Sequence, residues 1–493
     1  MRKLSLLSKV IIGLLLLSRC TPVEEQKTSM LIRNAAIIDG TGSDRYIGSI
    51  RIIDNIITEI GKLEVMASDS VIDGTNMALS PGFIDTHSHH DWDTSRTVDA
   101  AISQGITTII VGQDGSSRNS ISHYFDSLAT YPLSLNVGSY IGHNTVRAAV
   151  MGEDFKREAT NEEIEAMKQL VIKGMKDGAL GLSTGLEYDP GIYSTTEEVI
   201  ELAKITSGLG GRYISHMRSE DINFEKSIDE ILRIGKEANI PVQISHFKLA
   251  RKGLWGQAAN VLERLDSARA KGVLVTADVY PYQYWQSTMT VLFPKRDFDN
   301  RVSAEFAITE LTSPEGMIIA EFKANTEYEN LTLEDIAILR EEDPVTTYME
   351  LIRMSLETPG ESIIAKSMDL DDIKTLTRWK YANICSDGAP VGHPRGWGAF
   401  PRYLNMDTGE SLEMKIHKMT AQGAENLGLD GIGYIKVGYY ADLVLFNPDR
   451  FVDNATFEEG QLRASGLELV FVSGEIVYKN SSPTFKYPGR VIK

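Results

Sequence analysis

Histidines recur at one kind of position in this chain: the end of an apolar run that has the pattern of a β-strand. The stretch 81–93, PGFIDTHSHHDWD, places His87 and His89 directly after such a run. In an extended strand, residues i and i+2 point the same way, so both imidazoles can reach one ion. Imidazole nitrogens and carboxylate oxygens are common ligands of Zn²⁺. The spacing therefore predicts part of a metal site.

Further apolar runs end in residues that bind metals or transfer protons. They are Asp114, His143, His216, His246 and Asp387. Any one of them alone would be explained more simply as a structural core or loop residue, and Asp-Gly at 114–115 is also a common turn pair. As a set they predict a centre for one or two zinc ions, whereas His90 faces the other way and is expected to be structural.

The elements that must position these residues alternate in type. Between residues 80 and 429, eight short apolar runs each precede a helix-like stretch, which predicts a (β/α)₈ barrel of the α/β class. Active groups in such a barrel lie at the carboxyl ends of the strands. Residues 289–380 interrupt the rhythm with charged, helix-leaning sequence too long for a simple connection. We expect a lid or subdomain there, over the barrel mouth.

The two terminal segments have a different sequence pattern. Residues 30–79 and 430–493 contain short β-rich runs separated by Gly, Asp and Asn turns. These segments are expected to pair into one small β-sandwich, with the barrel inserted between them.

The first residues have the layout of an export signal. Arg2 and Lys3 precede an apolar run that ends at Cys20, so residues 1–20 are expected to be a signal peptide and residues 21–29 a polar tether. The LLSRC sequence resembles a bacterial lipoprotein processing site with Cys20 as the lipidated residue, although Arg19 departs from that pattern. An ordinary cleaved signal or an uncleaved anchor is the alternative. The predicted location is the periplasm, or the membrane through a lipid anchor.

Charge narrows the partners. The net charge is −18, which disfavours nucleic acid because its recognition needs a basic face. Cys385 is the only other cysteine, so the fold is not built on disulfides. The expected partner is a small-molecule substrate, and membrane contact is expected only through the lipid; the sequence does not indicate an oligomeric state.

Several motifs together resemble a known family, the N-acyl-D-amino-acid deacylases (D-aminoacylases) of the amidohydrolase superfamily. They are PGFIDTHSHHD, GHNTVR from Gly142, GALGLSTGLEYDPG from Gly178, ISHMRSE from Ile214, ISHFK from Ile244, DVYPY from Asp278 and SDGAPVGHPRGWGAFPR from Ser386. The resemblance implies that His87, His89 and Asp387 form one part of the metal centre. It also implies that His216 and His246 hold the tightly bound zinc.

One position departs from the family pattern. Asp114 stands in a Gly112-Gln113-Asp114-Gly115 turn where these deacylases usually have a zinc-binding cysteine. A carboxylate is a harder ligand than a thiolate and tolerates Mn²⁺ or Co²⁺. An aspartate can also bridge two ions through its two oxygens. We therefore expect Asp114 to be a ligand, with a plain turn residue as the alternative.

The resemblance further implies a clamp for the α-carboxylate of a substrate. Lys248, Tyr282 and Arg395 match the residues that hold this group, and Ser287 and Thr288 are weaker candidates nearby. Arginine suits the role because its planar fork binds a carboxylate through two bonds. The alternative for Lys248 and Arg395 is a solvated surface charge.

The implied activity is hydrolysis of the amide bond of N-acyl amino acids, those of D configuration in this family. Asp387 would act as general base and acid, and His143 would assist at the oxyanion or the acyl side. A cyclic amidase of the dihydroorotase or hydantoinase type is an alternative, but the fourth predicted strand has no lysine that could be carboxylated to bridge two metals. A non-catalytic, substrate-binding lipoprotein is another, and the full set of strand-end ligands counts against it.

Overall fold

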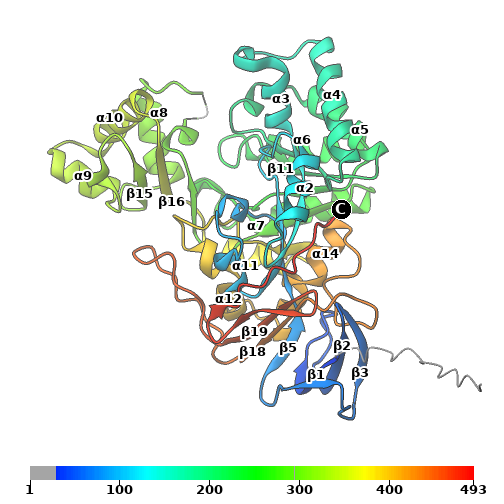
Figure 1. The fold of residues 1–493 in the computed structure, drawn as a ribbon. Helices are drawn as coiled ribbons and strands as arrows, with labels where there is room; N and C mark the ends of the chain where they lie inside the picture. Colours follow the sequence, from blue (N-terminus) through cyan, green and yellow to red (C-terminus); the bar gives the residue numbers. More distant parts are fainter. Residues whose placement is uncertain (1–28, 294) are drawn as a thin grey trace, which may run out of the picture.

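A barrel of parallel strands forms the centre of the computed structural model, which describes residues 29–293 and 295–493 (Figure 1). The strands form two hydrogen-bonded runs, β6-β7-β8 and β17-β13-β12-β11-β10-β9, every pair parallel. Their bounds are β6 Phe83–Asp85, β7 Ile106–Val111, β8 Asn136–Ser139, β9 Ile141–Gly142, β10 Gly181–Gly185, β11 Arg212–His216, β12 Val242–Ile244, β13 Val275–Val279 and β17 Ala382–Ile384. Only Tyr140 separates β8 from β9, so these two pieces form one barrel position.

The barrel closes between its first and last strands. The backbone N–H of Asp387 donates to the carbonyl of His87 at 2.9 Å, and that of His89 donates to Gly388 at 3.0 Å. The predicted (β/α)₈ barrel is thereby confirmed. Each strand is short and buried on both faces, as β7 with its sequence ITTIIV shows, and this burial explains the continuous apolar runs in the sequence.

Helices surround the strands. The principal ones are α3 His143–Met151, α4 Asn161–Lys176, α5 Thr196–Gly208, α6 Phe224–Glu237, α7 Ala258–Ala270, α11 Leu370–Arg378, α12 Arg395–Asn405, α13 Leu412–Met419 and α14 Ala421–Leu427. Thr160 and Glu163 start α4 with a reciprocal capping box. The α6 helix buries Ile228, Ile231 and Ile234 on one stripe, as expected for a helix that covers a sheet.

The insertion is a subdomain with its own sheet, at the left of Figure 1. Its antiparallel strands are β14 Tyr284–Ser287, β15 Met317–Phe322 and β16 Glu361–Lys366, in the order β14-β16-β15. Its main helices are α8 Arg301–Phe306, α9 Leu333–Arg340 and α10 Pro344–Glu357. The subdomain therefore spans 284–366, whereas the sequence predicted 289–380. The difference arises because β14 pairs with β16, while α11 packs on α7 and β17 of the barrel.

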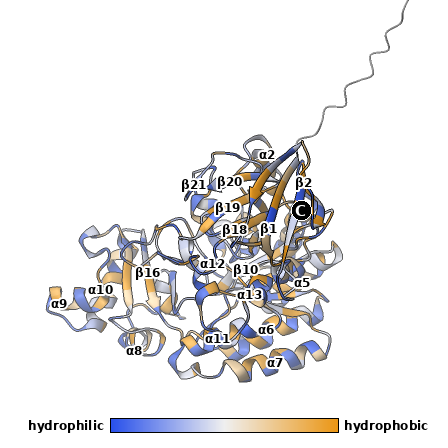
Figure 2. Ribbon diagram, turned by 90° about the horizontal axis from the view of Figure 1, so that it is seen from below, coloured by the Kyte–Doolittle hydropathy of each residue, from blue (hydrophilic) through white to orange (hydrophobic). Residues whose placement is uncertain are grey.

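The terminal segments form one continuous nine-stranded sheet, in the order β21-β20-β19-β18-β5-β1-β2-β3 with β4 beside β1. Its bounds are β1 Ser29–Ile37, β2 Tyr46–Ile53, β3 Ile56–Gly61, β4 Asp69–Asp73, β5 Ala78–Pro81, β18 Leu443–Phe446, β19 Leu467–Val472, β20 Glu475–Lys479 and β21 Ser482–Pro483. The sheet curls over a common core that includes Ile50, Leu443 and Phe471, so that Ile56 forms a bridge with Tyr440. Its strands are largely hydrophobic in Figure 2.

This sheet joins the barrel through β5, which pairs with strands of both terminal segments and ends one residue before β6 begins. Buried Asp442 strengthens the joint because it accepts hydrogen bonds from Asn136 of β8 and from Arg490. The predicted signal peptide, Cys20 and all but the last residue of the tether lie outside the described residues. Within the part that is described, no helix has both the length and the apolar character needed to cross a bilayer.

Candidate active site

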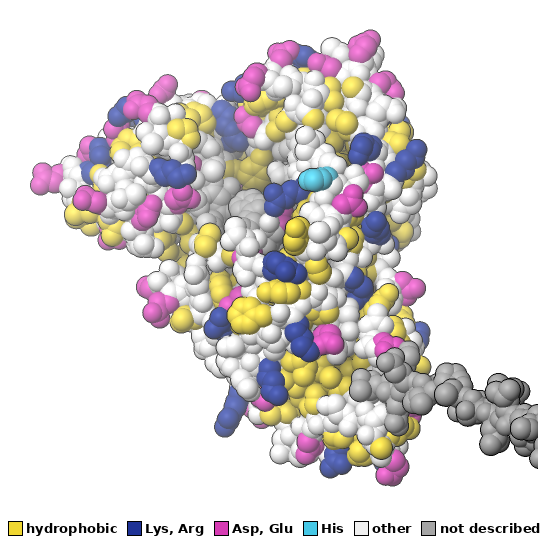
Figure 3. Space-filling view, in the orientation of Figure 1, with side chains coloured by type: hydrophobic (Ala, Val, Ile, Leu, Met, Phe, Trp, Pro, Cys, Tyr) yellow, Lys and Arg dark blue, Asp and Glu magenta, His cyan; other side chains and the backbone are white. Residues whose placement is uncertain are grey.

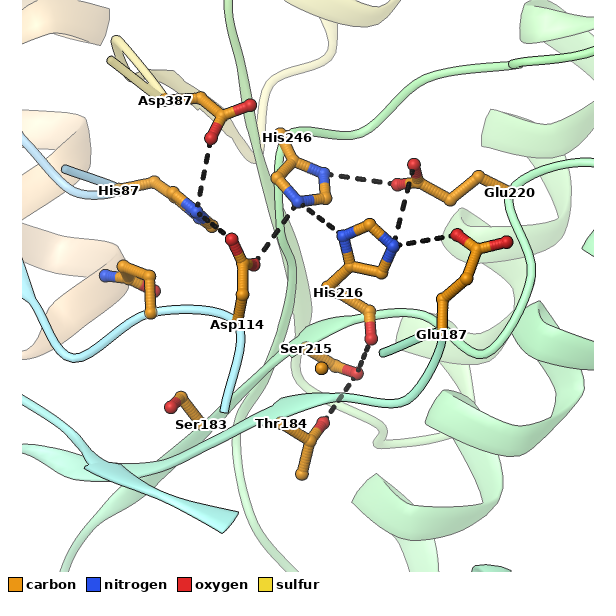
Figure 4. A network of polar contacts seen from close by, with 12 residues as sticks. His87, Asp114, Ser183, Thr184, Glu187, Ser215, His216, Glu220, His246 and Asp387 are labelled. Atoms are coloured by element: carbon orange, nitrogen blue, oxygen red, sulfur yellow. Dashed lines mark hydrogen bonds and ion pairs between the residues drawn. The ribbon is translucent and has the colours of Figure 1, made fainter. Parts of the chain in front are cut away.

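Asp114 lies at the centre of a cluster of histidines and carboxylates at the carboxyl ends of the barrel strands (Figure 4). Its Oδ2 atom is 3.3 Å from Nε2 of His87 and 3.2 Å from Nε2 of His89. Its Oδ1 atom is 3.3 Å from Nε2 of His246. The two carboxylate oxygens therefore face two different groups of side chains, which we call the first and second sides of the cluster.

The first side consists of His87, His89 and Asp387. Asp387 Oδ1 lies 3.6 Å from Nε2 of His87 and 3.4 Å from Nε2 of His89. Its other oxygen forms an ion pair with Arg395, 2.7 Å away. Burial opposes ionisation of Asp387, but the Arg395 guanidinium and the His246 imidazole hold the pKa of this carboxyl well below its usual range. It is an anion at neutral pH.

The second side consists of His216 and His246, whose Nδ1 and Nε2 atoms are 2.9 Å apart. An acidic residue stands behind each ring: Glu187 lies 2.9 Å from Nε2 of His216, and Glu220 lies 3.1 Å from Nδ1 of His246. Burial and the neighbouring Asp221 raise the pKa of Glu187 well above its usual range. Burial lowers the pKa of His216 to about 4, so this imidazole is neutral at neutral pH, as a metal ligand must be. Lys248 reaches both Glu220 oxygens, at 2.7 and 2.6 Å.

The backbone is strained where it presents three of these side chains. Asp114, His246 and Asp387 have φ angles of 53°, 36° and 48°, in the region that favours glycine. At Asp114 the flanking Gly112 and Gly115 also have positive φ, and a Cβ at Gly112 would lie 2.5 Å from the carbonyl oxygen of Tyr140. Strain of this kind is retained at functional sites because the surrounding structure over-determines it.

The donor set fits a metal centre. His87, Asp114, His246 and Asp387 each offer a ligand atom within 4.8 Å of the others, and His216, Glu220 and His246 form a second such group. Asp114 Oδ1 is buried and makes no hydrogen bond, although burial of a carboxylate is costly unless it is paired. Imidazole nitrogens together with carboxylate oxygens form the donor set that Zn²⁺ and related cations take.

The cluster lines a cavity of about 560 Å³ between the barrel mouth and the insertion, visible as a hollow in Figure 3. The insertion supplies one wall through Trp285, Ser287, Thr288, Leu292 and Leu311, among others. The insertion therefore forms part of the cavity wall at the barrel mouth.

The structure brings most of the predicted clamp to this cavity. Lys248, Ser287, Thr288 and Arg395 line it. Both cations are buried and already paired, Lys248 with Glu220 and Arg395 with Asp387. They are therefore not solvated surface charges.

Two predicted residues lie elsewhere. Tyr282 does not line the cavity; its hydroxyl donates to Asp453 at 2.9 Å, and Arg402 lies over its ring. His143 is also absent from the lining and pairs with buried Glu198 at 2.8 Å. The described geometry gives neither residue the substrate or catalytic contact that the sequence predicted. Tyr282 lies three residues beyond the end of β13 and His143 begins α3, and the loop or helix at each position turns the side chain to a partner outside the cavity.

Sequence reasoning missed the role of two acidic residues. Glu220 follows His216 by four residues in ISHMRSE, and Glu187 comes two residues after β10. The sequence did offer a clue: each acidic residue follows a strand end within a few positions. A carboxylate in such a place commonly orients a histidine that binds a metal.

Comparison with known proteins defines the class. The model of the amidohydrolase family matches residues 366–478. The D-aminoacylase of Alcaligenes xylosoxydans xylosoxydans is 33% identical over 95% of this chain and 98% of its own length. The N-acyl-D-glutamate deacylase of the same organism is 30% identical over 95% of this chain and 97% of its own length.

A solved structure agrees with these relatives. The N-acyl-D-glutamate deacylase of Bordetella bronchiseptica, complexed with zinc and a phosphonate inhibitor that mimics the tetrahedral intermediate, superposes with a TM-score of 0.84 at 29% identity, over 94% of this chain and 99% of that one. A D-hydantoinase, by contrast, shares only the fold, with 15% identity and a TM-score of 0.56. The chain belongs to the amidohydrolases, and among them to the D-aminoacylase family.

Proposed function

We propose that the protein is a metal-dependent deacylase that hydrolyses the amide bond of N-acyl-D-amino acids. The observation that carries this proposal is the placement of Asp387: one oxygen faces the histidines of the first side, and the other is paired with Arg395 at the cavity wall. The similarity to D-aminoacylase and N-acyl-D-glutamate deacylase supports the substrate class. Zinc is the proposed metal, because the related deacylase structure contains it and the donor set suits it.

Bound zinc would supply a Lewis acid that polarises an amide carbonyl and lowers the pKa of a water. Asp387, ionised through its pairing with Arg395, accepts a proton from the attacking water as the new C–O bond forms. The same carboxyl then delivers that proton to the amide nitrogen as the C–N bond breaks. One water is consumed, and the products are a carboxylic acid and a free amino acid.

Arg395 and Lys248 are the groups proposed to hold the α-carboxylate of the substrate. Both point into the cavity with an acidic partner already bound, so binding would add a second carboxylate to each cation. Arginine can do this because its guanidinium carries five donors. Lys248 has three; two reach the Glu220 oxygens, and Nζ also lies 2.6 Å from Nδ1 of His246, so a substrate carboxylate would have to displace one of these contacts.

The direct test is amine release from matched pairs of N-acetyl-D- and N-acetyl-L-amino acids, with the metal content of the same protein measured by elemental analysis. We expect the D series to be hydrolysed at a rate proportional to zinc content. Asp387→Asn is the matched control, because it should retain the fold and lose turnover. If protein with full zinc content released no amine from any of these substrates, the proposed function would be contradicted.

The two alternatives are less well supported. Two observations argue against a cyclic amidase. The sequence identity to the D-hydantoinase is only 15%, and the fourth strand, β10, presents Ser183 and Thr184 instead of lysine. A pure binding protein would need neither a strained carboxylate nor a buried base beside a metal cluster.

We also propose, on the sequence alone, that the mature protein is exported and anchored through a lipid on Cys20. Detergent partitioning of the wild type should place it with the membrane fraction, and Cys20→Ser should release it or block processing. A soluble mature wild type that lacks the first twenty residues would contradict the anchor.

A further inference from the structure

We infer that the amino-acid part of the substrate has an uncharged, apolar side chain, and that acidic D-amino acids are rejected. The inference rests on the proposed function, since it assumes that an N-acyl amino acid occupies the cavity. Among the relatives, one deacylase is named for glutamate and another carries no side-chain designation, so membership of the family leaves this question open.

The first observation is the supply of positive charge. Among the described residues that line the cavity, the lysines and arginines are Lys248 and Arg395 alone. Both are already paired with buried carboxylates, and both are assigned to the α-carboxylate. A second carboxylate, on a side chain, would find no further cation in this lining. The lack of a further cation does not depend on the direction in which the substrate side chain points, because it concerns the whole set of lining residues.

Among the arginines near the lining, Arg118 lies 3.7 Å from Asp91, and two more, Arg296 and Arg251, are also engaged. Arg296 donates to the backbone carbonyls of Thr290, Phe293 and Glu187. Arg251 lies 3.5 Å from Glu310, and its guanidinium stacks over the ring of Phe306. None of the three lines the cavity, so a carboxylate inside it would have to draw one of them away from these partners.

The second observation is the sign of the remaining charges. Beyond the carboxylates that face the histidines or Lys248, the lining contains further acidic residues, namely Asp91, Asp189, Asp221 and Glu321. A carboxylate side chain would meet like charges, which destabilise a bound anion in a partly desolvated site.

The third observation is the apolar wall that the insertion contributes. Trp285, Val291, Leu292 and Leu311 line the cavity, and each is at least nine-tenths buried in the protein as a whole. Contact with an apolar side chain of the substrate makes the free energy of binding more favourable, by roughly 25 cal/mol for each Å² of apolar surface removed from water. Ala250 and Ala389 extend the apolar lining and leave room beside it.

The test compares N-acetyl-D-leucine, N-acetyl-D-glutamate and N-acetyl-D-lysine on the zinc-loaded full-length protein. We expect kcat/KM for the leucine substrate to exceed that for the glutamate substrate by at least about 100-fold, because the glutamate carboxylate would be buried without a partner. The lysine substrate should fall between the two. A preference for glutamate, or for lysine over leucine, overturns the inference. No turnover of any substrate would instead contradict the proposed function.

A charge reversal at the cavity mouth tests the role of the lining. Glu321 is an exposed residue of β15 that lines the cavity, and Glu327 is an exposed residue of the same subdomain that does not. Glu321→Lys should lower the ratio of kcat/KM for the leucine substrate to kcat/KM for the glutamate substrate by about three- to tenfold at low salt, and by less at high salt. Glu327→Lys makes the same change in net charge and should leave the ratio unaltered. Equal shifts in both variants would show that overall charge, and not the lining, sets the preference, which overturns the inference.

If the wild type does prefer glutamate, Arg296→Ala gives the next measurement. Loss of that preference in the variant would assign the side-chain carboxylate to Arg296 and confirm that the inference is wrong. Arg251→Ala is the matched control, since it removes the other arginine behind the wall.

Discussion

The two sides of the cluster share Asp114 but are built differently. On the second side, His216 and His246 have side chains only 4% and 3% exposed, and each ring has an acidic residue behind it. On the first side, His89 is 21% exposed, and the carboxylate there is paired with Arg395 at the cavity wall. The comparison indicates that the second side is organised to hold an ion firmly. The first side, open to the cavity, is organised to move protons beside a bound substrate.

The strongest test of this difference is Asp387→Asn. Loss of the general base should lower kcat by about 10²–10⁴-fold, whereas zinc should stay bound at His216 and His246, because neither residue is changed. Turnover and metal content measured on the same sample separate the two effects. Asp189→Asn, an exposed acid in the same lining, is the control and should be nearly neutral. A kcat near that of the wild type in Asp387→Asn would remove this residue from the mechanism.

Arg395→Ala should have the next largest effect, a loss of about 2–5 kcal/mol in kcat/KM, because the α-carboxylate and Asp387 both lose a buried partner. Arg395 helps to keep the pKa of Asp387 low, so its removal raises that pKa. The base is then protonated at a higher pH, and the acid limb of the pH profile should move upward.

An N-acyl amine without the carboxylate provides the control for Arg395→Ala. It should lose less than the full substrate while showing the same movement of the acid limb. Equal losses on both substrates would count against a clamp, and an unmoved acid limb would count against the coupling to Asp387.

Asp114→Ala should damage both sides at once, because its two oxygens face His87 and His89 on one side and His246 on the other. We expect metal occupancy and activity to fall together, the latter by about 100-fold, with partial recovery on added zinc. Asp114→Cys should keep activity and shift the metal preference towards zinc, since a thiolate is the softer ligand. Full metal content and normal activity in Asp114→Ala would make this residue a turn former only.

Glu220→Gln should have the smallest effect and should be confined to the second side. The substitution keeps the shape but removes the counter-charge of Lys248 and the carboxylate behind His246. We expect zinc affinity to fall by about 10- to 100-fold, measured by competition with a chelator. Asp221→Asn, whose carboxylate bonds Ser219 and the backbone of Ile222 instead, should leave the affinity unchanged. Equal weakening by both variants would point to a general electrostatic effect.

The sequence by itself determined the barrel and placed six candidate ligands at its strand ends. Parallel strands buried on both faces must be continuous apolar runs, and polar residues directly after them can only gather at one end of the barrel. The positions of His87, His89, Asp114, His216, His246 and Asp387 are therefore readable without a structure. What the sequence indicated was their place at the strand ends; their orientation was not readable, because Asp114 and Asp387 lie three residues beyond their strands and have positive φ.

Only the tertiary structure decided what lies beyond the strand ends. Tyr282 and His143 follow a change in backbone direction, and their side chains meet Asp453 and Glu198 instead of the cavity. Glu187 and Glu220 reach the histidines because the loops after β10 and β11 fold back over the barrel mouth. Nothing in the local pattern fixes such contacts, because they join segments that only the closed barrel brings together. A candidate ligand could be recognised from its local sequence, whereas the residues that contact it could be known only from the folded structure.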